Sequence, residues 1–312
     1  MDFDDIKDNI PFSSPVEPVK LTLDSEFQFD CHPGVSCFTA CCRNINIQLT
    51  PYDIVRLKQR LELSSSDFVA RYTVPFEMDH HGLPGLNLLT KSGTRECVFL
   101  ADEGCSVYPN RPAACRYYAF GSMAVRPKDS AVVEDVFFLV KEPHCHGHEE
   151  QKKQTVREYR SAQGVDRYDD ANREWRDVII KKRSGGPTIG APSERSMQLF
   201  DMCSYDMDSF REFVQTPGFC DLFEIGDAEM RSLLEDDEAL LRFAMRFLKQ
   251  TLFGERSIAL REGARERRIE ERREAWRKRR DAEVARHKAE KENLLREEQQ
   301  QFRADAGDDD PG

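Results

Sequence analysis

The chain has 312 residues, of which 39% are hydrophobic and 33% charged, and its net charge is −11. This length allows about two domains of ordinary size. The acidic balance argues against a protein that coats nucleic acid along its whole length, because phosphate binding needs a surplus of Lys and Arg. No run of about eighteen apolar residues and no secretory signal pattern occurs, so we expect a cytoplasmic protein without membrane insertion.

The N-terminal segment is acidic, and we expect ordered structure to begin only after it. Residues 1–30 hold eight acidic side chains, two basic ones and three prolines, a composition typical of a solvated arm. Two helix starts follow. Thr50 is a good N-cap in front of Pro51, and Ser64 with Asp67 has the spacing that satisfies free amides at the start of a second helix.

Further along, the pattern predicts short elements around several cysteines. Two apolar runs flank the turn Asp102-Glu103-Gly104, which predicts a small β-hairpin bracketed by Cys97 and Cys105. After a proline pair, a short helix is expected to begin near Ala113. Residues 132–140 are rich in β-branched and aromatic side chains and predict a strand.

The second half of the chain is predicted to be helical. Residues 149–183 form one helical stretch, and the Gly- and Pro-rich segment 184–193 is a loop. Residues 240–252 form a strongly amphipathic helix that ends at Gly254. Residues 255–303 are dominated by Arg, Glu and Lys without a sustained heptad, so an exposed single helix is expected.

These elements predict an α+β protein built around a small metal-organised domain with a short hairpin and helices. The expected parts are a disordered acidic arm (1–26), a cysteine-cluster metal-binding domain (27–183), a linker (184–195), an acidic helical unit (196–254) and a charged helical tail (255–312).

The cysteines carry the strongest chemical signal. Eight of the ten lie in the first half of the chain: Cys31, Cys37, Cys41, Cys42, Cys97, Cys105, Cys115 and Cys145. Without an export signal, such thiols are expected to bind metal and not to form structural disulfides, and their clustering argues against scattered core cysteines. Thiolates suit zinc and iron–sulfur clusters, and a metal site usually takes four ligands, so eight thiolates suffice for two sites.

The adjacent pair Cys41-Cys42 limits how the thiols are shared. Neighbouring side chains point to opposite faces of a strand, or about 100° apart on a helix. We therefore expect the pair to send one thiolate to each of two metal centres, or one to a cluster and one to the core. The spacings match neither the paired C-x2-C of a zinc ribbon nor the cysteine run of bacterial ferredoxins, so zinc and iron–sulfur both stay open.

The motifs resemble those of the YkgJ-like cysteine-cluster family, which is described as zinc- or iron-chelating. The resemblance covers about residues 27–150 and rests on the Cys41-Cys42 pair, Cys97-x-Phe99-Leu100, Gly104-Cys105-x-Val107-Tyr108, Arg111-Pro112-x-x-Cys115-Arg116 and His144-Cys145-x-Gly147. The family usually opens with C-x2-C-x2-CC, whereas this chain has Cys31-x5-Cys37-x3-Cys41-Cys42. That difference makes Cys31 the weakest of the implied ligands. A flagellin lysine methylase has a similar cysteine pattern.

Two functions follow as hypotheses. The first is an iron–sulfur protein that transfers electrons or serves as a component of a redox or methyl-transfer system, with an unknown protein or redox partner. The alternative is a zinc-stabilised protein-interaction module without catalysis.

A few further residues have candidate roles, although no catalytic residue can be named. Arg111 and Arg116 are candidates to neutralise a thiolate cluster or to bind a substrate carboxylate, and His144 and His146 are candidates to support the metal. Residues 265–280 contain nine basic residues and four Glu, which allows at most weak nucleic-acid binding.

Overall fold

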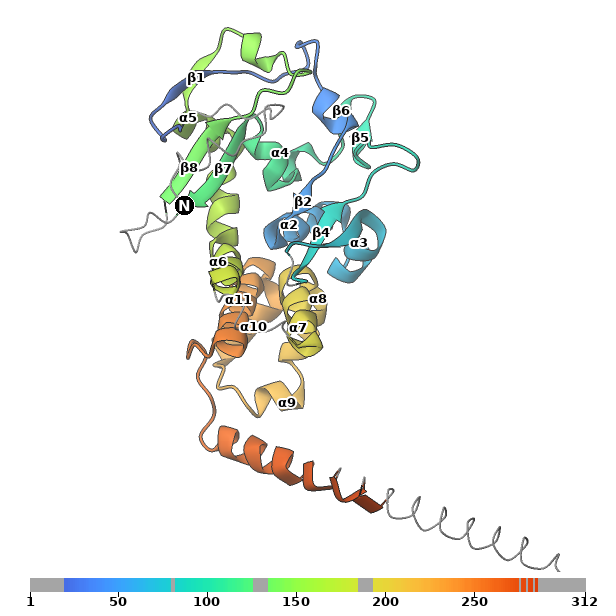
Figure 1. Cartoon of the computed structure of the whole chain (residues 1–312), viewed down its shortest axis with the longest axis vertical. Coiled ribbons are helices and arrows are strands. Elements are labelled where there is room, and N and C mark those ends of the chain that lie inside the picture. Colours follow the sequence, from blue (N-terminus) through green and yellow to red (C-terminus); the bar gives the residue numbers. More distant parts are fainter. Residues whose placement is uncertain are drawn as a thin grey trace, which may run out of the picture. The chain divides into compact units, whose positions relative to one another are not determined.

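The computed structural model describes residues 20–79, 82–125, 134–184 and 193–274, with short pieces between 276 and 285. Its helices are α2 (Pro51–Leu61), α3 (Ser65–Tyr72), α4 (Ala113–Tyr117), α5 (Val156–Gln163), α6 (Val165–Ser184), α7 (Glu194–Tyr205), α8 (Met207–Val214), α9 (Pro217–Cys220), α10 (Asp227–Glu235) and α11 (Asp237–Phe253). Its strands are β1 (Glu26–Gln28), β2 (Gln48–Leu49), β3 (Thr73–Glu77), β4 (Pro84–Leu88), β5 (Leu100–Ala101), β6 (Gly104–Cys105), β7 (Phe120–Val125), β8 (Glu134–Leu139) and β9 (Lys153–Thr155). The fold is mixed α+β, as predicted (Figure 1).

Both helix starts expected near the N-terminus are confirmed. The Thr50 side chain accepts a hydrogen bond from the N–H of Asp53, and the Asp53 carboxylate accepts one from the N–H of Thr50, so a complete capping box opens α2. The Ser64 side chain accepts from the N–H of Asp67 at the start of α3. These caps use only neighbours three residues apart, which is why the sequence pattern reveals them.

The strands form small antiparallel sheets. β7 pairs with β8, β1 with β9 and β5 with β6, while β4 lies between β2 and β3. β8 confirms the strand predicted at residues 132–140 as far as that segment is described. The stretch expected to be helical from residue 149 instead begins with β9, because that strand completes a pair with β1 before α5 starts.

One cluster of buried aromatic and aliphatic side chains packs around these strands. It comprises Leu21, Phe27, Phe29, Ala119, Phe120, Phe137, Val156 and Tyr159. Leu21 lies in the segment expected to be an arm, yet its N–H donates to the carbonyl oxygen of Phe137 at 2.7 Å. Ordered structure therefore begins earlier than Phe27, whereas residues 1–19 lie outside the described part of the chain.

A second core joins α2 and α6 to α7, α8 and α11. Its buried side chains include Tyr52, Trp175, Phe210 and Phe243. Lys58 of α2 is buried there, with its Nζ 3.1 Å from a carboxylate oxygen of Asp208. The predicted amphipathic helix is confirmed as α11, which ends at Gly254 in the left-handed conformation that glycine adopts without strain.

The described residues fall into two compact units. The first takes in Met1–Thr216 and Gly226–Ile258, so it contains both the cysteine-rich segment and the helices α7, α8, α10 and α11. The boundary expected at residues 184–195 stays a prediction, and residues 185–192 are not described. Across the helices that the structure describes, none is both long and apolar enough to cross a membrane.

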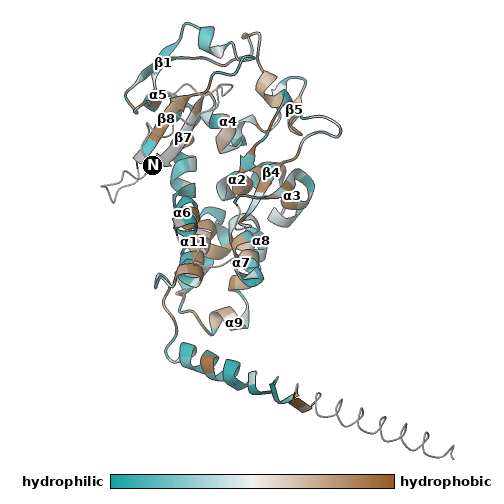
Figure 2. Cartoon of the chain, in the orientation of Figure 1, coloured by the Kyte–Doolittle hydropathy of each residue, from teal (hydrophilic) through white to brown (hydrophobic). Residues whose placement is uncertain are grey.

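The second unit takes in Pro217–Ile225 and Ala259–Gly312. Within it, Phe223 forms a β-bridge with Leu260. A helix follows over residues 264–274. Figure 2 shows that this helix is mainly hydrophilic, and its apolar side chain Ile269 is 47% exposed. The helix expected from residue 255 therefore begins only at residue 264, because residues 255–263 include a buried side chain, Ile258, and the β-bridge of Leu260. The described residues from 265 to 274 are helical and mostly exposed, as expected.

Candidate metal centre

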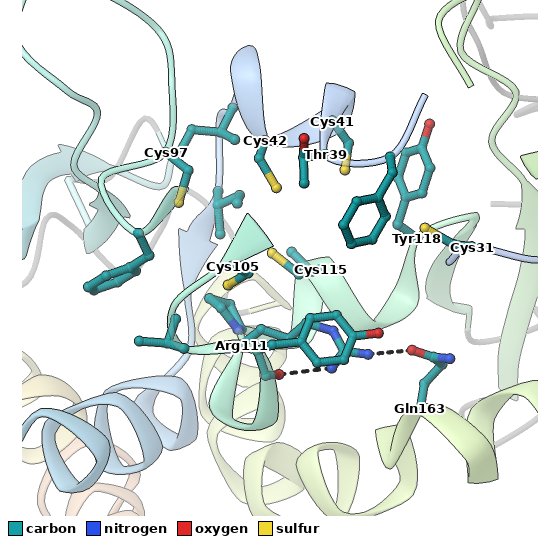
Figure 3. A pocket seen from close by; sticks show the side chains of 18 of the residues that line it. Cys31, Thr39, Cys41, Cys42, Cys97, Cys105, Arg111, Cys115, Tyr118 and Gln163 are labelled. Atoms are coloured by element: carbon teal, nitrogen blue, oxygen red, sulfur yellow. Dashed lines mark hydrogen bonds between the residues drawn. The ribbon is translucent and has the colours of Figure 1, made fainter. Parts of the chain in front are cut away.

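Six of the eight clustered cysteines line one cavity of about 320 Å³: Cys31, Cys41, Cys42, Cys97, Cys105 and Cys115 (Figure 3). Four of these thiols, those of Cys42, Cys97, Cys105 and Cys115, surround a common space in the close-up view. The wall between the thiols is largely aromatic and aliphatic, with contributions from Phe29, Phe38, Phe99, Val107, Tyr118 and Tyr159.

Backbone contacts bring the inner part of this cluster together, and we call Cys42, Cys97, Cys105 and Cys115 the inner thiol group. The N–H of Cys97 donates to the carbonyl oxygen of Cys42 at 2.7 Å. Cys105 lies opposite Leu100 in the predicted hairpin, which is confirmed as β5 and β6. Cys115 sits in α4, the short helix predicted after the proline pair.

A second set of contacts gathers Cys31, Cys37 and Cys145, which we call the outer thiol group. The N–H of His146 donates to the Sγ of Cys37 at 3.2 Å. The N–H of Asp30 donates to the carbonyl oxygen of Gly147 at 3.0 Å, which places the chain before Cys31 beside the chain after Cys145.

Gly147 permits this close approach of the two segments. A Cβ atom at Gly147 would lie 2.6 Å from the carbonyl oxygen of Asp30 and 2.6 Å from the ring of Phe29. Only glycine therefore fits at this position, which explains the glycine in the His144-Cys145-x-Gly147 motif.

Cys41 connects the two groups. It lies with Cys42 in the 3-10 turn Ala40–Arg43, and its charge influences the pKa of Cys31 in the outer group and of Cys115 in the inner group. The hydrogen bond from the Cys42 thiol lowers the pKa of Cys41 to about 7, and the same bond raises the pKa of Cys42. The adjacent pair therefore favours one thiolate and one thiol.

Burial and neighbouring charges raise the pKa of five further clustered thiols, those of Cys31, Cys97, Cys105, Cys115 and Cys145. Burial, followed by the charges of Cys41 and Cys37, raises the pKa of Cys31 to about 11. Burial and the neighbouring Cys97 likewise raise the pKa of Cys115. Such repulsion is what a bound cation relieves, because metal ligation removes the thiol proton and compensates the charge.

The donor set thus fits a soft metal, although its geometry is not yet that of a coordination shell. Within the described residues, no three Cys, His, Asp or Glu side chains already lie where they would hold one metal ion. All ten cysteines are described and none forms a disulfide, so the eight clustered thiols remain available as metal ligands.

The two arginines have different surroundings. Arg111 lines the cavity and is 9% exposed, and its guanidinium donates to the carbonyl oxygen of Tyr108 and to the side chain of Gln163. Arg116 does not line the cavity. Its guanidinium instead donates to three backbone carbonyl oxygens, those of Arg111, Pro109 and Gln163.

The two histidines lie at the edge of the outer thiol group. His146 contacts Cys37 through its backbone, while its ring nitrogen Nδ1 lies 2.7 Å from the hydroxyl of Ser36. His144 is 39% exposed and its Nε2 lies 3.6 Å from the carboxylate of Glu142. A supporting role for either ring stays a prediction.

Asp53 is a residue that the sequence reasoning missed. It is fully buried, and its Oδ1 accepts a hydrogen bond from the N–H of Ala113 at 2.7 Å, so the residue that caps α2 also holds the start of the helix that carries Cys115. The Thr50-x-x-Asp53 capping-box spacing was the only local signal. Its second contact, sixty residues away, has no local signature.

Comparison with known proteins comes down to one match. Residues 30–146 match the model of the CxxCxxCC family, whose description is "Putative zinc- or iron-chelating domain". This range contains both thiol groups and both arginines. No curated protein and no solved structure matches the chain. Residues 30–146 are therefore similar to the zinc- or iron-chelating domain that this family model describes, in agreement with the resemblance of their motifs.

Proposed function

We propose that the domain holds an iron–sulfur cluster with its clustered thiols and serves in electron transfer or as a component of a redox or methyl-transfer system. The observation that carries this proposal is that six cysteines line one common cavity of about 320 Å³. A structural zinc site is closed, with about 2.3 Å between metal and sulfur, and leaves no space at its centre. A polynuclear cluster needs such a space and takes cysteine thiolates as its ligands.

The inner thiol group supplies four candidate ligands from three separate chain segments. Cys41 and the outer thiol group supply four more, which is enough for a second centre. When bound, an iron–sulfur cluster supplies the capacity to accept and release an electron. The chain's own part is to keep the apolar walls of Phe29, Phe38 and Tyr118 around the thiols, which limits access of water.

A zinc-stabilised interaction module is the second candidate, and the shortness of the thiol-bearing elements favours it. Cys41 and Cys42 lie in a four-residue turn, Cys105 in a two-residue strand and Cys115 in a five-residue helix. Elements of this size are marginal alone, and structural zinc often organises such segments. Either metal would require a reducing compartment such as the cytoplasm, because the thiols must stay unpaired.

Anaerobic purification of the full chain distinguishes the two candidates. Iron and acid-labile sulfide together with visible charge-transfer absorption would support the iron–sulfur cluster, whereas colourless protein that contains zinc would support the module. Purification of Cys42→Ser beside Cys203→Ser tests the site itself, because Cys203 is fully buried in α7 outside the cluster. Wild-type protein that lacks both metals when iron and zinc are supplied would contradict the proposal.

A further inference from the structure

Arg111 is a buried cation without a carboxylate partner. The residue is 9% exposed, and its guanidinium lies over the ring of Tyr108 at 4.0 Å from the centroid. Its hydrogen bonds go to neutral oxygens only, the backbone of Tyr108 and the side-chain amide of Gln163. Within the described part of the chain, no Asp or Glu forms an ion pair with it.

The other buried cations that lie outside the Arg111–Arg116 segment are paired with acids. Lys58 lies 3.1 Å from carboxylate oxygens of both Asp208 and Asp237. Arg160 lies 2.6 Å from a carboxylate oxygen of Asp169. An unpaired buried charge is costly, so Arg111 is expected to have a negative partner that the protein's carboxylates do not provide.

Arg116 is also buried, but it does not line the cavity that contains the thiols. Its three hydrogen bonds fix the backbone around Pro109–Arg116, it lies over the ring of Tyr168 at 4.3 Å, and its charge acts on the buried carboxylate of Asp53. Arg111, in contrast, lines the cavity itself, together with Cys105 and Cys115. Of the two arginines, Arg111 is therefore the one placed to act on the thiols.

We propose that Arg111 is the counter-charge of the metal–thiolate centre, held toward the inner thiol group by Gln163 and Tyr108. This inference rests on the proposed metal binding. A divalent ion with four thiolates carries a net charge of about −2, and a guanidinium in a water-poor wall stabilises that charge more strongly than one in solvent. Arg111 then acts as a positioning residue through the field that it exerts on the ligands.

Three substitutions test the charge of Arg111 separately from its shape. Arg111→Gln removes the charge, and Arg111→Lys keeps it. Gln163→Glu leaves the arginine in place but puts a carboxylate against its guanidinium, which neutralises the charge toward the cavity. Arg157→Gln is the matched control, because this arginine is 59% exposed and pairs with Asp24 on the surface.

The primary measurement is zinc affinity, obtained by competition of each metal-free full-length protein with a chromophoric chelator. Arg111→Gln and Gln163→Glu should each bind zinc about 10- to 100-fold more weakly than wild type, the range seen when partners of metal ligands are removed. Arg111→Lys should recover most of this loss, and Arg157→Gln should equal wild type.

If the purified protein contains an iron–sulfur cluster, the reduction potential is a second measurement. Arg111→Gln and Gln163→Glu should then have more negative reduction potentials than wild type, because the reduced cluster carries the greater negative charge. A tenfold change in the ratio of the two redox states corresponds to about 59 mV for one electron.

The outcomes separate this inference from the proposed function. Wild-type protein that binds no metal would overturn the proposed function. Wild-type protein that binds metal, with Arg111→Gln and Gln163→Glu both equal to Arg157→Gln in affinity, would overturn the counter-charge role alone. That result would instead point to an external carboxylate as the partner of Arg111. Should Arg111→Gln fail to fold, as judged by circular dichroism, Gln163→Glu decides the question, since it keeps Arg111 and places a side chain of the same length against its guanidinium.

Discussion

The backbone N–H of Cys97 donates a hydrogen bond to the carbonyl oxygen of Cys42 at 2.7 Å. This contact joins the turn that carries the adjacent cysteines to the segment that leads into the β5–β6 hairpin. Cys97 is also buried, with 7% of its surface exposed. This backbone hydrogen bond therefore places Cys42 and Cys97 side by side although they are far apart in the chain.

Serine at Cys42, Cys97, Cys105 or Cys115 is expected to remove most of the bound metal, because a hydroxyl is a poor ligand for a soft metal and the remaining thiolates leave its shell incomplete. Metal per chain, measured on purified protein, is the readout. Serine at Cys203 or Cys220 should leave metal content unchanged and cost only packing, about 1 kcal/mol. Loss of metal from the Cys203 and Cys220 variants would show that the ligand assignment is wrong.

Removal of the metal should loosen the cysteine-cluster domain. Structural zinc sites contribute on the order of 10 kcal/mol to folding, and the segments that carry these thiols have little core of their own. We expect chelator treatment to reduce near-UV circular dichroism and to increase proteolysis between residues 30 and 146. Readdition of the metal should reverse both changes. Unchanged spectra and protease resistance after complete metal removal would contradict a metal-organised fold.

Asp53→Ala is expected to destabilise the protein by about 2–4 kcal/mol, because two partly buried backbone amides lose their acceptor. These are the N–H groups of Thr50, at 2.8 Å from Oδ2, and of Ala113, at 2.7 Å from Oδ1. Asp53→Asn should cost less, since one oxygen remains and burial already raises the pKa of Asp53 to about 6. Urea unfolding is the measurement, with Asp170→Ala as the control because Asp170 is 77% exposed. Equal midpoints for Asp53→Ala and the control would exclude this bridging role.

Asp208 should make stability fall in acid. Burial alone would raise its pKa, but hydrogen bonds from the N–H of Ser65 and from Lys58 hold it at about 2, below the usual 3.8. Because the folded-state pKa is the lower one, this stabilisation is present above about pH 4 and is lost as the pH falls toward 2. We expect about 1–2 kcal/mol at pH 7, reduced for partial exposure. The difference in unfolding free energy between wild type and Asp208→Asn should shrink from pH 5 to pH 2.5, and a constant difference would count against the prediction.

The tail beyond residue 274 should be separable from the metal site. Trp276 and Val284 are 66% and 61% exposed, whereas Ile258 and Ala264 are each 4% exposed, so a cut before Ile258 would remove packed side chains. A chain that ends at residue 274 should keep its metal content and melting temperature. Any binding of an acidic partner or RNA through residues 265–280 should weaken steeply with salt. A truncated chain that precipitates or loses metal would show that the residues beyond 274 stabilise the rest of the protein.

Features that depend on near neighbours in the chain could be predicted from the sequence. The caps at Thr50 and Ser64, the hairpin at residues 100–105 and the end of α11 at Gly254 were all predicted, because each rests on hydrogen bonds or backbone preferences within a few residues. The clustering of cysteines also shows in the sequence, and it led to the family that residues 30–146 match.

The way in which these parts meet depends on contacts that form when the chain folds. The separation of the thiols into two groups depends on contacts such as Cys42 with Cys97, and Cys37 with His146, between segments far apart in the chain. Arg111 and Arg116 look alike in the sequence, yet only Arg111 lines the cavity. Sequence spacing cannot report such differences, because they depend on which distant backbone and side-chain atoms surround each group after folding, and that environment sets the charge and reactivity of the group.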